Sequence, residues 1–383
     1  MNLFIRSNRP LRFILAATTL FCRTQALPTM SNLQLISKNL HLKEAIDFGV
    51  PGPENFEVLQ TSVYSDDMEN GDILVQLLSI SADPYLRNSV KKTKGAMNSG
   101  SNEEGAIMQG FVSGRVLRSK NEAWIEGDFF GAHSHFSTVQ IVSKANAKGF
   151  WKLTDLIEDE SQISLGVGVL GMPGSTAYAG VLDILRPIAG ETIFVSAAAG
   201  AVGGLVGMIA KNVFGCKVIG SCGGPVKCAL IKEKYGFDHA IDYKKIPDAA
   251  GLITALREVA PEGIDMYFES VGGMHFEAAF ALLRPHGRIA VCGEIAEYGA
   301  ENPNLSSISL MRMIYTFQRI EGFVCGPWLR GEKGNFIVDM SRWIKEGKVK
   351  MQEESFTDGI ENWPLAFRSL FTGANIGKVV VRV

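Results

Sequence analysis

A run of small residues near the middle of the chain has the composition of a phosphate-binding turn. It comprises Ala197–Gly204, which contains only Gly, Ala and Val, and lies between an apolar segment, Thr192–Ser196, and a helix-like one, Leu205–Asn212. Small side chains let the backbone approach a pyrophosphate, and the free amides at a helix start attract its charge. This order of strand, turn and helix predicts a dinucleotide site, although Ala198 replaces the first glycine of Gly-x-Gly-x-x-Gly. A tightly packed structural turn is the alternative.

The segment after this turn bears on the choice of cofactor. A second predicted strand, Lys217–Ser221, ends where an NAD-specific enzyme places an acidic residue on the ribose hydroxyls. No Asp or Glu occurs between Glu191 and Glu233. Lys227 follows the strand instead, and its ammonium could neutralise the 2′-phosphate of NADP. The sequence therefore favours NADP(H), with a solvated lysine at a helix start as the alternative for Lys227.

The cysteines and histidines lack metal-binding spacing. The six cysteines include no Cys-x-x-Cys pair, so they indicate neither a zinc cluster nor a disulfide framework. Reduced thiols in an intracellular protein are the simplest interpretation. His133 and His135 form the one close histidine pair, and we interpret them as loop residues because nothing nearby resembles further ligands. We expect no metal.

The first third of the chain has the pattern of short strands. From Leu33 to about Gly149, β-like runs such as Ile73–Ile80 and Phe111–Leu117 are broken by Gly, Pro, Asn and Asp. Such runs with turn residues between them predict a mainly-β domain.

The remainder follows a different pattern. From about Gly171, apolar strands alternate with helices as far as Ile289–Gly293, and the tail holds a predicted helix, Phe336–Lys345, and a final strand, Lys378–Val383. Alternating β and α units indicate a parallel, doubly wound sheet. The expected fold class is α/β, with a doubly wound parallel Rossmann sheet beside a mainly-β domain.

The overall composition narrows the kind of partner. The chain has 383 residues, 46% of them hydrophobic and 20% charged, with a formal net charge of −2. This is the composition of a soluble globular protein of two domains. Lys and Arg are scattered, so the sequence lacks the basic patch that a nucleic-acid binder needs.

The N-terminus has the features of a targeting segment. The first 43 residues contain no Asp or Glu, residues 1–29 include four arginines, and the apolar run Phe13–Cys22 is too short to span a membrane. An organelle transit peptide is one interpretation. A translation start at Met30 and a secretory signal cleaved after Ala26 are the alternatives. We expect an intracellular protein, mitochondrial if residues 1–29 are a transit peptide and otherwise cytoplasmic.

Five strings resemble those of prostaglandin reductases and alkenal double-bond reductases, a zinc-free branch of the medium-chain dehydrogenase/reductase family. They occur in family order within residues 33–383: Gly171–Tyr178, Ala197–Gly204, Lys232–Asp238, Gly287–Gly293 and Gly373–Lys378. The resemblance implies an N-terminal extension (1–30), a GroES-like β domain (31–165), a Rossmann NADP-binding domain (166–330) and a C-terminal segment that returns to the β domain (331–383). It also implies a homodimer.

Two strings differ from those of the zinc-containing relatives. Where zinc alcohol dehydrogenases place a metal-binding Cys and a Gly-His-Glu, this chain has Ala82–Arg87 and Met108–Gly110. Without these ligands no Lewis acid can activate an alcohol. The resemblance therefore implies a reaction that needs only a hydride and a hydrogen-bond donor.

The resemblance also implies which residues bind the cofactor. Ser270, in Phe268–Gly273, replaces the Asn of the family and has a shorter reach, and Gly224–Val226 replaces the Ser-Asp-Glu before the phosphate-binding lysine. Segment Cys292–Tyr298 would line the cofactor channel. The other expected contacts are Gly200, Ala201, Val202 and Gly203 for the pyrophosphate, Lys227 and Tyr243 for the 2′-phosphate, and Phe323, Val324 and Asn375 for the nicotinamide side.

The implied reaction reduces the C=C bond of an α,β-unsaturated aldehyde or ketone, such as a 2-alkenal or a 15-oxoprostaglandin. Hydride adds to the β-carbon, and the protein must stabilise the charge that collects on the carbonyl oxygen. Tyr298 is the candidate donor, directly or through the cofactor ribose and a water, since a phenol with a pKa of about 10 is protonated at neutral pH. Tyr85 is a candidate for the substrate wall. A quinone reductase and a non-catalytic NADPH-binding protein are the alternatives.

Overall fold

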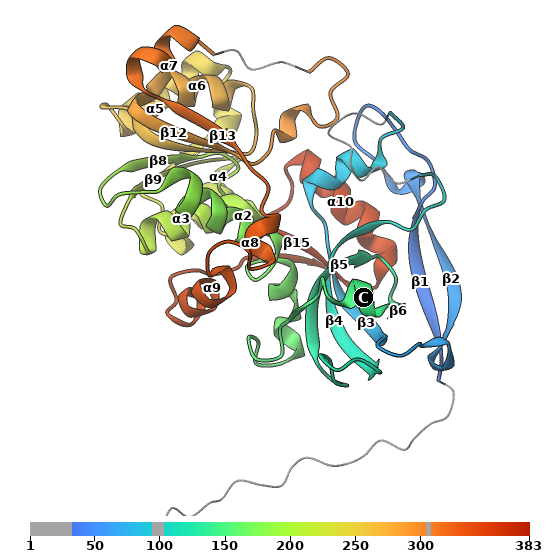
Figure 1. The fold of residues 1–383 in the computed structure, drawn as a ribbon. Coiled ribbons are helices and arrows are strands. Elements are labelled where there is room, and N and C mark those ends of the chain that lie inside the picture. The colour runs from blue at the N-terminus through green and yellow to red at the C-terminus, as the bar shows by residue number, and fades with distance from the viewer. Residues whose placement is uncertain (1–32, 94–102, 304–307) are drawn as a thin grey trace, which may run out of the picture.

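The computed structural model describes residues 33–93, 103–303 and 308–383. The described residues form three sheets, of two, six and seven strands, which lie in two lobes joined by helices (Figure 1). Among the described residues no single helix is long and apolar enough to cross a membrane; one bent pair, Glu160–Val167 and Met172–Leu185, passes that test by length and composition alone.

The first lobe is built on a six-stranded, fully parallel sheet in the order β10-β9-β8-β11-β12-β13. The chain starts in the middle at β8, moves outward to β10, and then returns to β11 on the other side. This reversal between β8 and β11 is the switch point at which doubly wound folds bind dinucleotides. The strands are β8 (Thr192–Val195), β9 (Lys217–Cys222), β10 (His239–Asp242), β11 (Ile264–Glu269), β12 (Leu283–Val291) and β13 (Arg319–Gly322).

Helices cover both faces of this sheet, and a separate hydrophobic core lies on each face. The helices of this lobe are α2 (Met172–Ala179), α3 (Ala201–Asn212), α4 (Pro225–Ala229), α5 (Ala249–Val259), α6 (Met274–Leu282), α7 (Leu310–Thr316), α8 (Gly326–Leu329) and α9 (Phe336–Lys345). The expected doubly wound sheet is therefore confirmed.

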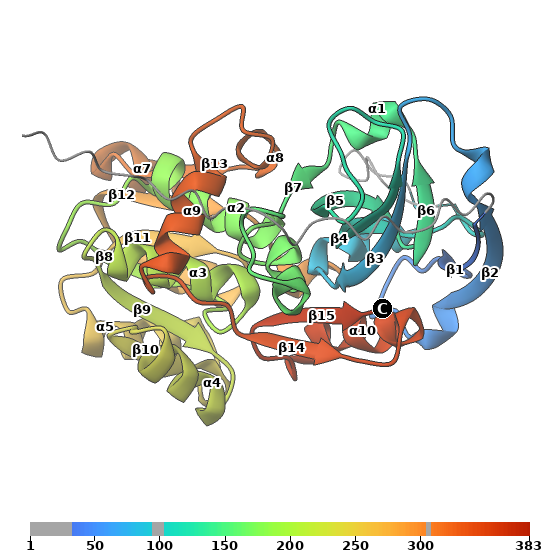
Figure 2. The same ribbon diagram turned by 90° about the horizontal axis from the view of Figure 1, so that it is seen from below.

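The second lobe holds a seven-stranded, largely antiparallel sheet in the order β14-β15-β3-β4-β5-β7, with β6 paired to β3. The last strand of the chain, β15, thus pairs with β3, and Figure 2 shows β14, β15 and α10 beside the N-terminal strands. Strands β1 and β2 form a separate, two-stranded antiparallel sheet. The elements are β1 (Gln34–Leu42), β2 (Phe56–Tyr64), β3 (Ile73–Ser81), β4 (Gln109–Ser119), β5 (Phe129–His135), β6 (Val139–Val142), α1 (Lys144–Ala147), β7 (Trp151–Lys152), β14 (Glu353–Phe356), α10 (Trp363–Thr372) and β15 (Lys378–Arg382). The expected mainly-β lobe is confirmed.

Two local interpretations were wrong. His133 and His135 lie in β5, not in a loop, and His133 pairs with Phe111 of β4. The helix after the phosphate turn begins at Ala201, four residues before the expected start at Leu205. The glycines that lowered its helix propensity are needed there for close packing, which outweighs their conformational cost.

Candidate active site

The turn between β8 and α3 has the shape of a phosphate cradle. Ala197 has a φ of +48°, Gly200 is the N-cap of α3, and the Gly200 amide donates to the Ala197 carbonyl at 2.9 Å. A Cβ at Gly203 would lie 2.5 Å from the Ala197 oxygen. The turn therefore requires glycine at 203. Residues 200–203 lie together at the start of the helix, where the free amides and the helix dipole favour a negative charge.

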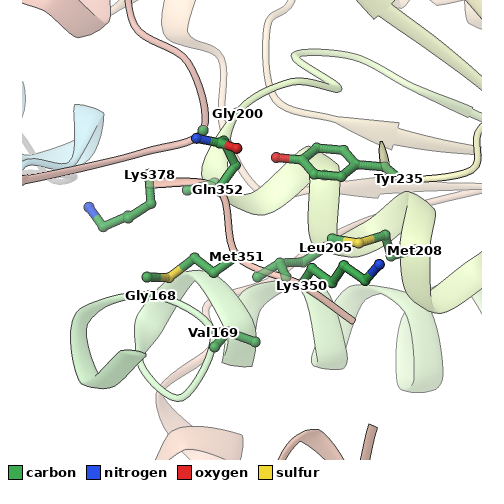
Figure 3. Close-up of a pocket in the computed structure, with 13 residues that line it drawn as sticks. Gly168, Val169, Gly200, Leu205, Met208, Tyr235, Lys350, Met351, Gln352 and Lys378 are labelled. Atoms are coloured by element: carbon green, nitrogen blue, oxygen red, sulfur yellow. The ribbon is translucent and has the colours of Figure 1, made fainter. Parts of the chain in front are cut away.

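The C-terminal segment closes one side of this turn. The Gly377 amide donates to the Ala199 carbonyl at 2.9 Å, and Gly200 and Gly377 form a β-bridge. A cavity of about 10 Å³ lies beside the turn, with Gln352 and Tyr235 among its lining residues (Figure 3). That volume fits about one water, so this cavity is a packing gap between α3 and the C-terminal segment. Asn375 lies two residues before Gly377, close to the turn.

Two cations and a phenol gather at the carboxyl end of β9. The Lys227 ammonium donates to the Gly373 carbonyl at 2.9 Å. A Cβ at Gly223 would lie 3.1 Å from the Tyr243 hydroxyl and 3.0 Å from Cε of Lys244. Burial lowers the pKa of Lys227, and the nearby Lys244 lowers it further. An anion at this place would relieve the repulsion between the lysines, so this donor set fits a 2′-phosphate.

Sequence reasoning missed Lys244 and also His275, which supports Tyr243. The His275 and Tyr243 rings meet edge to face at 5.5 Å, and Nε2 of His275 shares a 2.9 Å hydrogen bond with Oγ of Ser221. Burial lowers the pKa of His275 to about 4, so the ring is neutral at pH 7. The only sequence signal for Lys244 was its position directly after Tyr243.

At the switch point, Ser270 lies beside the carboxyl end of β12. Its Oγ is 3.4 Å from Sγ of Cys292, and its amide donates to Oγ of Ser196 at 3.0 Å. Glu269 fixes the same turn, since its Oε1 accepts the amides of Val271 at 2.6 Å and Gly272 at 2.9 Å. Burial raises the pKa of Glu269.

Tyr298 folds back over the segment that begins at Cys292. A Cβ at Gly293 would lie 2.8 Å from the Tyr298 hydroxyl. Burial, followed by the nearby Cys292, raises the pKa of Tyr298, so the phenol keeps its proton. The Gly49 amide donates to the Gly299 carbonyl at 2.8 Å, which ties the end of this loop to the β lobe.

Phe323 lies next to this segment. Its amide donates to the Val291 carbonyl at 3.3 Å, and its ring packs edge to face on Phe268 at 6.3 Å. Val324 follows with 79% of its surface exposed. Both residues therefore extend from the end of β13, beside the end of β12.

Tyr85 lies where the two lobes meet. It belongs to a 3₁₀ helix, Pro84–Val90, and its ring packs edge to face on Phe111 at 6.3 Å. Its hydroxyl is buried and has no hydrogen-bond partner among the described residues. Burial raises the pKa of Tyr85, with smaller effects of Asp83 and of Cys325 from the other lobe.

A buried ion pair holds the loop that carries Tyr85. The Lys378 ammonium contacts Oδ1 of Asp83 at 3.1 Å and donates to the Ala82 carbonyl at 2.9 Å. Because Lys378 directly follows Gly377, the loop is linked to the phosphate turn. Within the described ranges, no three His, Cys, Asp or Glu side chains are grouped so that they could hold a metal ion.

A doubly wound sheet with a glycine-rich phosphate turn, joined to a mainly-β lobe, defines a two-domain, dinucleotide-dependent oxidoreductase. Family models agree: residues 201–340 match the model described as "Zinc-binding dehydrogenase", and residues 23–152 match "N-terminal domain of oxidoreductase".

Comparison with individual relatives shows to which branch of these oxidoreductases the chain belongs. Prostaglandin reductase 1 of Mus musculus is 38% identical over 346 residues, covering 90% of this chain and 99% of the relative. The 2-alkenal reductase (NADP(+)-dependent) of Nicotiana tabacum is 36% identical, covering 92% and 98%. The crystal structure of CurA in complex with NADPH from Vibrio vulnificus is 34% identical and superposes with a TM-score of 0.78, covering 90% and 99%. The chain belongs to the medium-chain dehydrogenase/reductase family, in the zinc-free branch of the prostaglandin and 2-alkenal reductases.

Proposed function

We propose that the protein uses NADPH to reduce the C=C bond of α,β-unsaturated aldehydes and ketones. The observation that carries the cofactor assignment is the meeting of Lys227, Tyr243 and Lys244 at the end of β9. Lys227 comes from the span between Glu191 and Glu233, which contains no acidic residue, and the carboxylate of Asp242 is bonded to the amides of Gly224 and Lys244. Relatives named prostaglandin reductase, 2-alkenal reductase and curcumin reductase support the substrate class.

Each candidate residue has a defined task in this reaction. The amides of Gly200–Gly203 bind the pyrophosphate at the start of α3, and Lys227 and Tyr243 bind the 2′-phosphate together with Lys244. Ser270, Cys292, Phe323, Val324 and Asn375 complete the cofactor channel. NADPH, when bound, supplies the hydride.

Tyr298 stabilises the charge that develops during the reaction. Its hydroxyl stabilises the substrate carbonyl oxygen as that oxygen takes on the charge of an enolate. It does so by donating a hydrogen bond directly, or through the cofactor ribose and a water. The raised pKa of Tyr298 keeps the donor protonated at neutral pH. Tyr85 forms part of the substrate wall from the β lobe.

A substrate panel tests this assignment. Purified protein is mixed with NADPH and a 2-alkenal, an aryl enone, a quinone or a saturated aldehyde, and the absorbance of reduced nicotinamide is followed. The proposal expects oxidation with the alkenal and the enone, and products two hydrogens heavier. Turnover of the quinone alone would indicate a quinone reductase, and binding without oxidation a non-catalytic NADPH-binding protein.

We also propose a homodimer that forms through α7 and β13. Helix α7 exposes a row of large apolar side chains, Leu310, Met311, Ile314 and Tyr315, the last with 74% of its surface exposed. Strand β13 ends the parallel sheet, and its outer edge is unpaired within the described residues. Apolar patches and open edges of this kind support association. Sedimentation should give a dimer that Ile314→Glu dissociates, and a monomeric parent protein would contradict the proposal.

We propose an intracellular location, mitochondrial if residues 1–29 are a transit peptide and otherwise cytoplasmic. Residues 1–32 lie outside the described residues. The division into an extension (1–30), a GroES-like domain (31–165), a Rossmann domain (166–330) and a returning segment (331–383) is likewise proposed. The N-terminal sequence of the mature protein from fractionated cells tests the location and the removal of the extension; an intact Met1 would exclude cleavage of a transit peptide.

A further inference from the structure

Two cysteines flank the turn that presents Lys227. Cys222 is the last residue of β9 and is buried, and Cys228 lies in α4 and is partly exposed. Their Sγ atoms are 3.5 Å apart. The two thiols are therefore in direct contact although six positions separate them in sequence.

The backbone holds this geometry independently of the sulfurs. The Gly224 amide donates to Oδ1 of Asp242 at 2.8 Å, which anchors the turn to the end of β10, and the Cys228 amide donates to the Gly224 carbonyl at 3.1 Å. Gly224 has a φ of +91°, which favours glycine. The turn thus places the two sulfurs next to each other without a bond between them.

We propose that Cys222 and Cys228 are a peroxide-oxidisable dithiol, and that their disulfide weakens the binding of NADPH. The effect on NADPH rests on the proposed function. Lys227, which the proposed function assigns to the 2′-phosphate, is the residue directly before Cys228.

Hydrogen peroxide forms the disulfide in two steps. Hydrogen peroxide first oxidises the partly exposed Cys228 thiol to a sulfenic acid and is itself reduced to water. The Cys222 sulfur then attacks the Cys228 sulfur, the S–S bond forms, and the hydroxyl leaves as a second water with the Cys222 proton. Burial raises the pKa of Cys222, so Cys222 suits the second role, the resolving thiol, better than the first.

Bond formation must displace the Lys227 side chain. A disulfide has an S–S distance of about 2.05 Å, so the sulfurs must approach each other from their separation of 3.5 Å. The end of β9 lies buried in the sheet and is the fixed partner, whereas Cys228 lies partly exposed in α4, which forms the first turn of a helix that continues to Lys234. The movement therefore falls on α4 and draws Lys227 from Gly373. We expect the affinity for NADPH to fall about tenfold, the lower end of what the loss of one charge-assisted hydrogen bond gives.

Trypsin provides a direct assay, because it cleaves at Lys227, between the two cysteines. The full-length protein is treated with hydrogen peroxide, free thiols are alkylated, and the digest is analysed by mass spectrometry. The expected product is peptide 218–227 linked to peptide 228–232, two hydrogens lighter than the sum of the separate peptides. Fluorescence titration measures the Kd of NADPH before oxidation, after oxidation and after dithiothreitol.

Two variants test the role of the cysteine pair, and a third serves as the control. Cys222→Ser and Cys228→Ser should keep the parent affinity and lose both the linked peptide and the response to peroxide. Cys216→Ser removes a buried cysteine outside the pair and should keep both. A digest without the linked peptide would overturn the dithiol, and a linked peptide with an unchanged Kd would overturn its effect on NADPH. Failure of the reduced protein to bind NADPH would instead refute the proposed function, and the linked peptide would still decide whether the dithiol exists.

Discussion

The Nζ atom of Lys227 donates a hydrogen bond of 2.9 Å to the carbonyl oxygen of Gly373. This bond joins α4 of the Rossmann lobe to the end of α10, which packs on the β lobe. Asn375, expected near the nicotinamide, is two residues further along. The lysine is therefore held at the boundary between the lobes before any phosphate is present.

Lys227→Ala should weaken NADPH binding about 10- to 100-fold and leave NADH binding nearly unchanged, because a charge-assisted hydrogen bond contributes about 1.5–3 kcal/mol. Tyr243 and Lys244 should retain part of the selectivity. Titration of both cofactors measures the effect, with the exposed Lys232→Ala as the matched control. Equal losses for both cofactors would show that Lys227 supports the fold or the pyrophosphate.

Gly203→Ala should weaken both cofactors, because the added Cβ would lie 2.5 Å from the Ala197 carbonyl oxygen. Overpacking typically costs about 1–3 kcal/mol of folding stability, and relief of the clash shifts the amides of the turn, so both cofactors should lose affinity to a similar extent. Gly322→Ala is the control, since a Cβ there meets nothing within 4 Å. Unchanged affinity in Gly203→Ala would show that this turn does not contact the pyrophosphate.

Tyr298→Phe should lower kcat with little change in the Kd of NADPH. A direct donor to an oxyanion contributes a factor of roughly 100 to 1000, and an indirect one should give less. Because burial raises the pKa of Tyr298 above its usual value of about 10, the parent kcat should show no loss of this proton below about pH 10. Tyr64→Phe in β2 is the control. An unaltered kcat, where chemistry limits the rate, would remove Tyr298 from the mechanism.

Acid stability should depend on His275. Its pKa is about 4 in the folded protein and about 6.5 in an unfolded chain, so the unfolded state binds the extra proton between these values. The free energy of unfolding should have its full value above about pH 6.5 and should fall by up to about 3 kcal/mol as the pH is lowered towards 4. Urea unfolding at several pH values should show a shallower dependence for His275→Gln. Parallel curves for the two proteins would refute this account.

The sequence predicted the strands of both lobes because their patterns are local. Apolar runs with turn residues between them indicate strands, and small residues after a strand indicate the phosphate turn. The sequence could not predict the register in which neighbouring strands pair. Asp242 pairs with Cys222 in the parallel sheet, and only this register brings Lys244 beside Gly223.

The same limit explains why the sequence did not predict the strand position of His133, the contacts of His275 or the contact between Cys222 and Cys228. His133 lies in a strand whose other face packs into the core through Phe130 and Ala132, and the polar residues around His133 give no sequence signal for that strand. His275 and Ser221 are 54 residues apart, and their contact depends on how α6 packs on the sheet. The contact between Cys222 and Cys228 requires the turn at Gly224, which the motif alone did not reveal.

Isotope transfer tests the central claim most directly. NADPH that carries deuterium at the transferable position of C4 is incubated with the protein and a 2-alkenal, and the product is analysed by mass spectrometry and NMR. The account predicts a saturated aldehyde with one deuterium on the β-carbon. An allylic alcohol with deuterium on the former carbonyl carbon would contradict it.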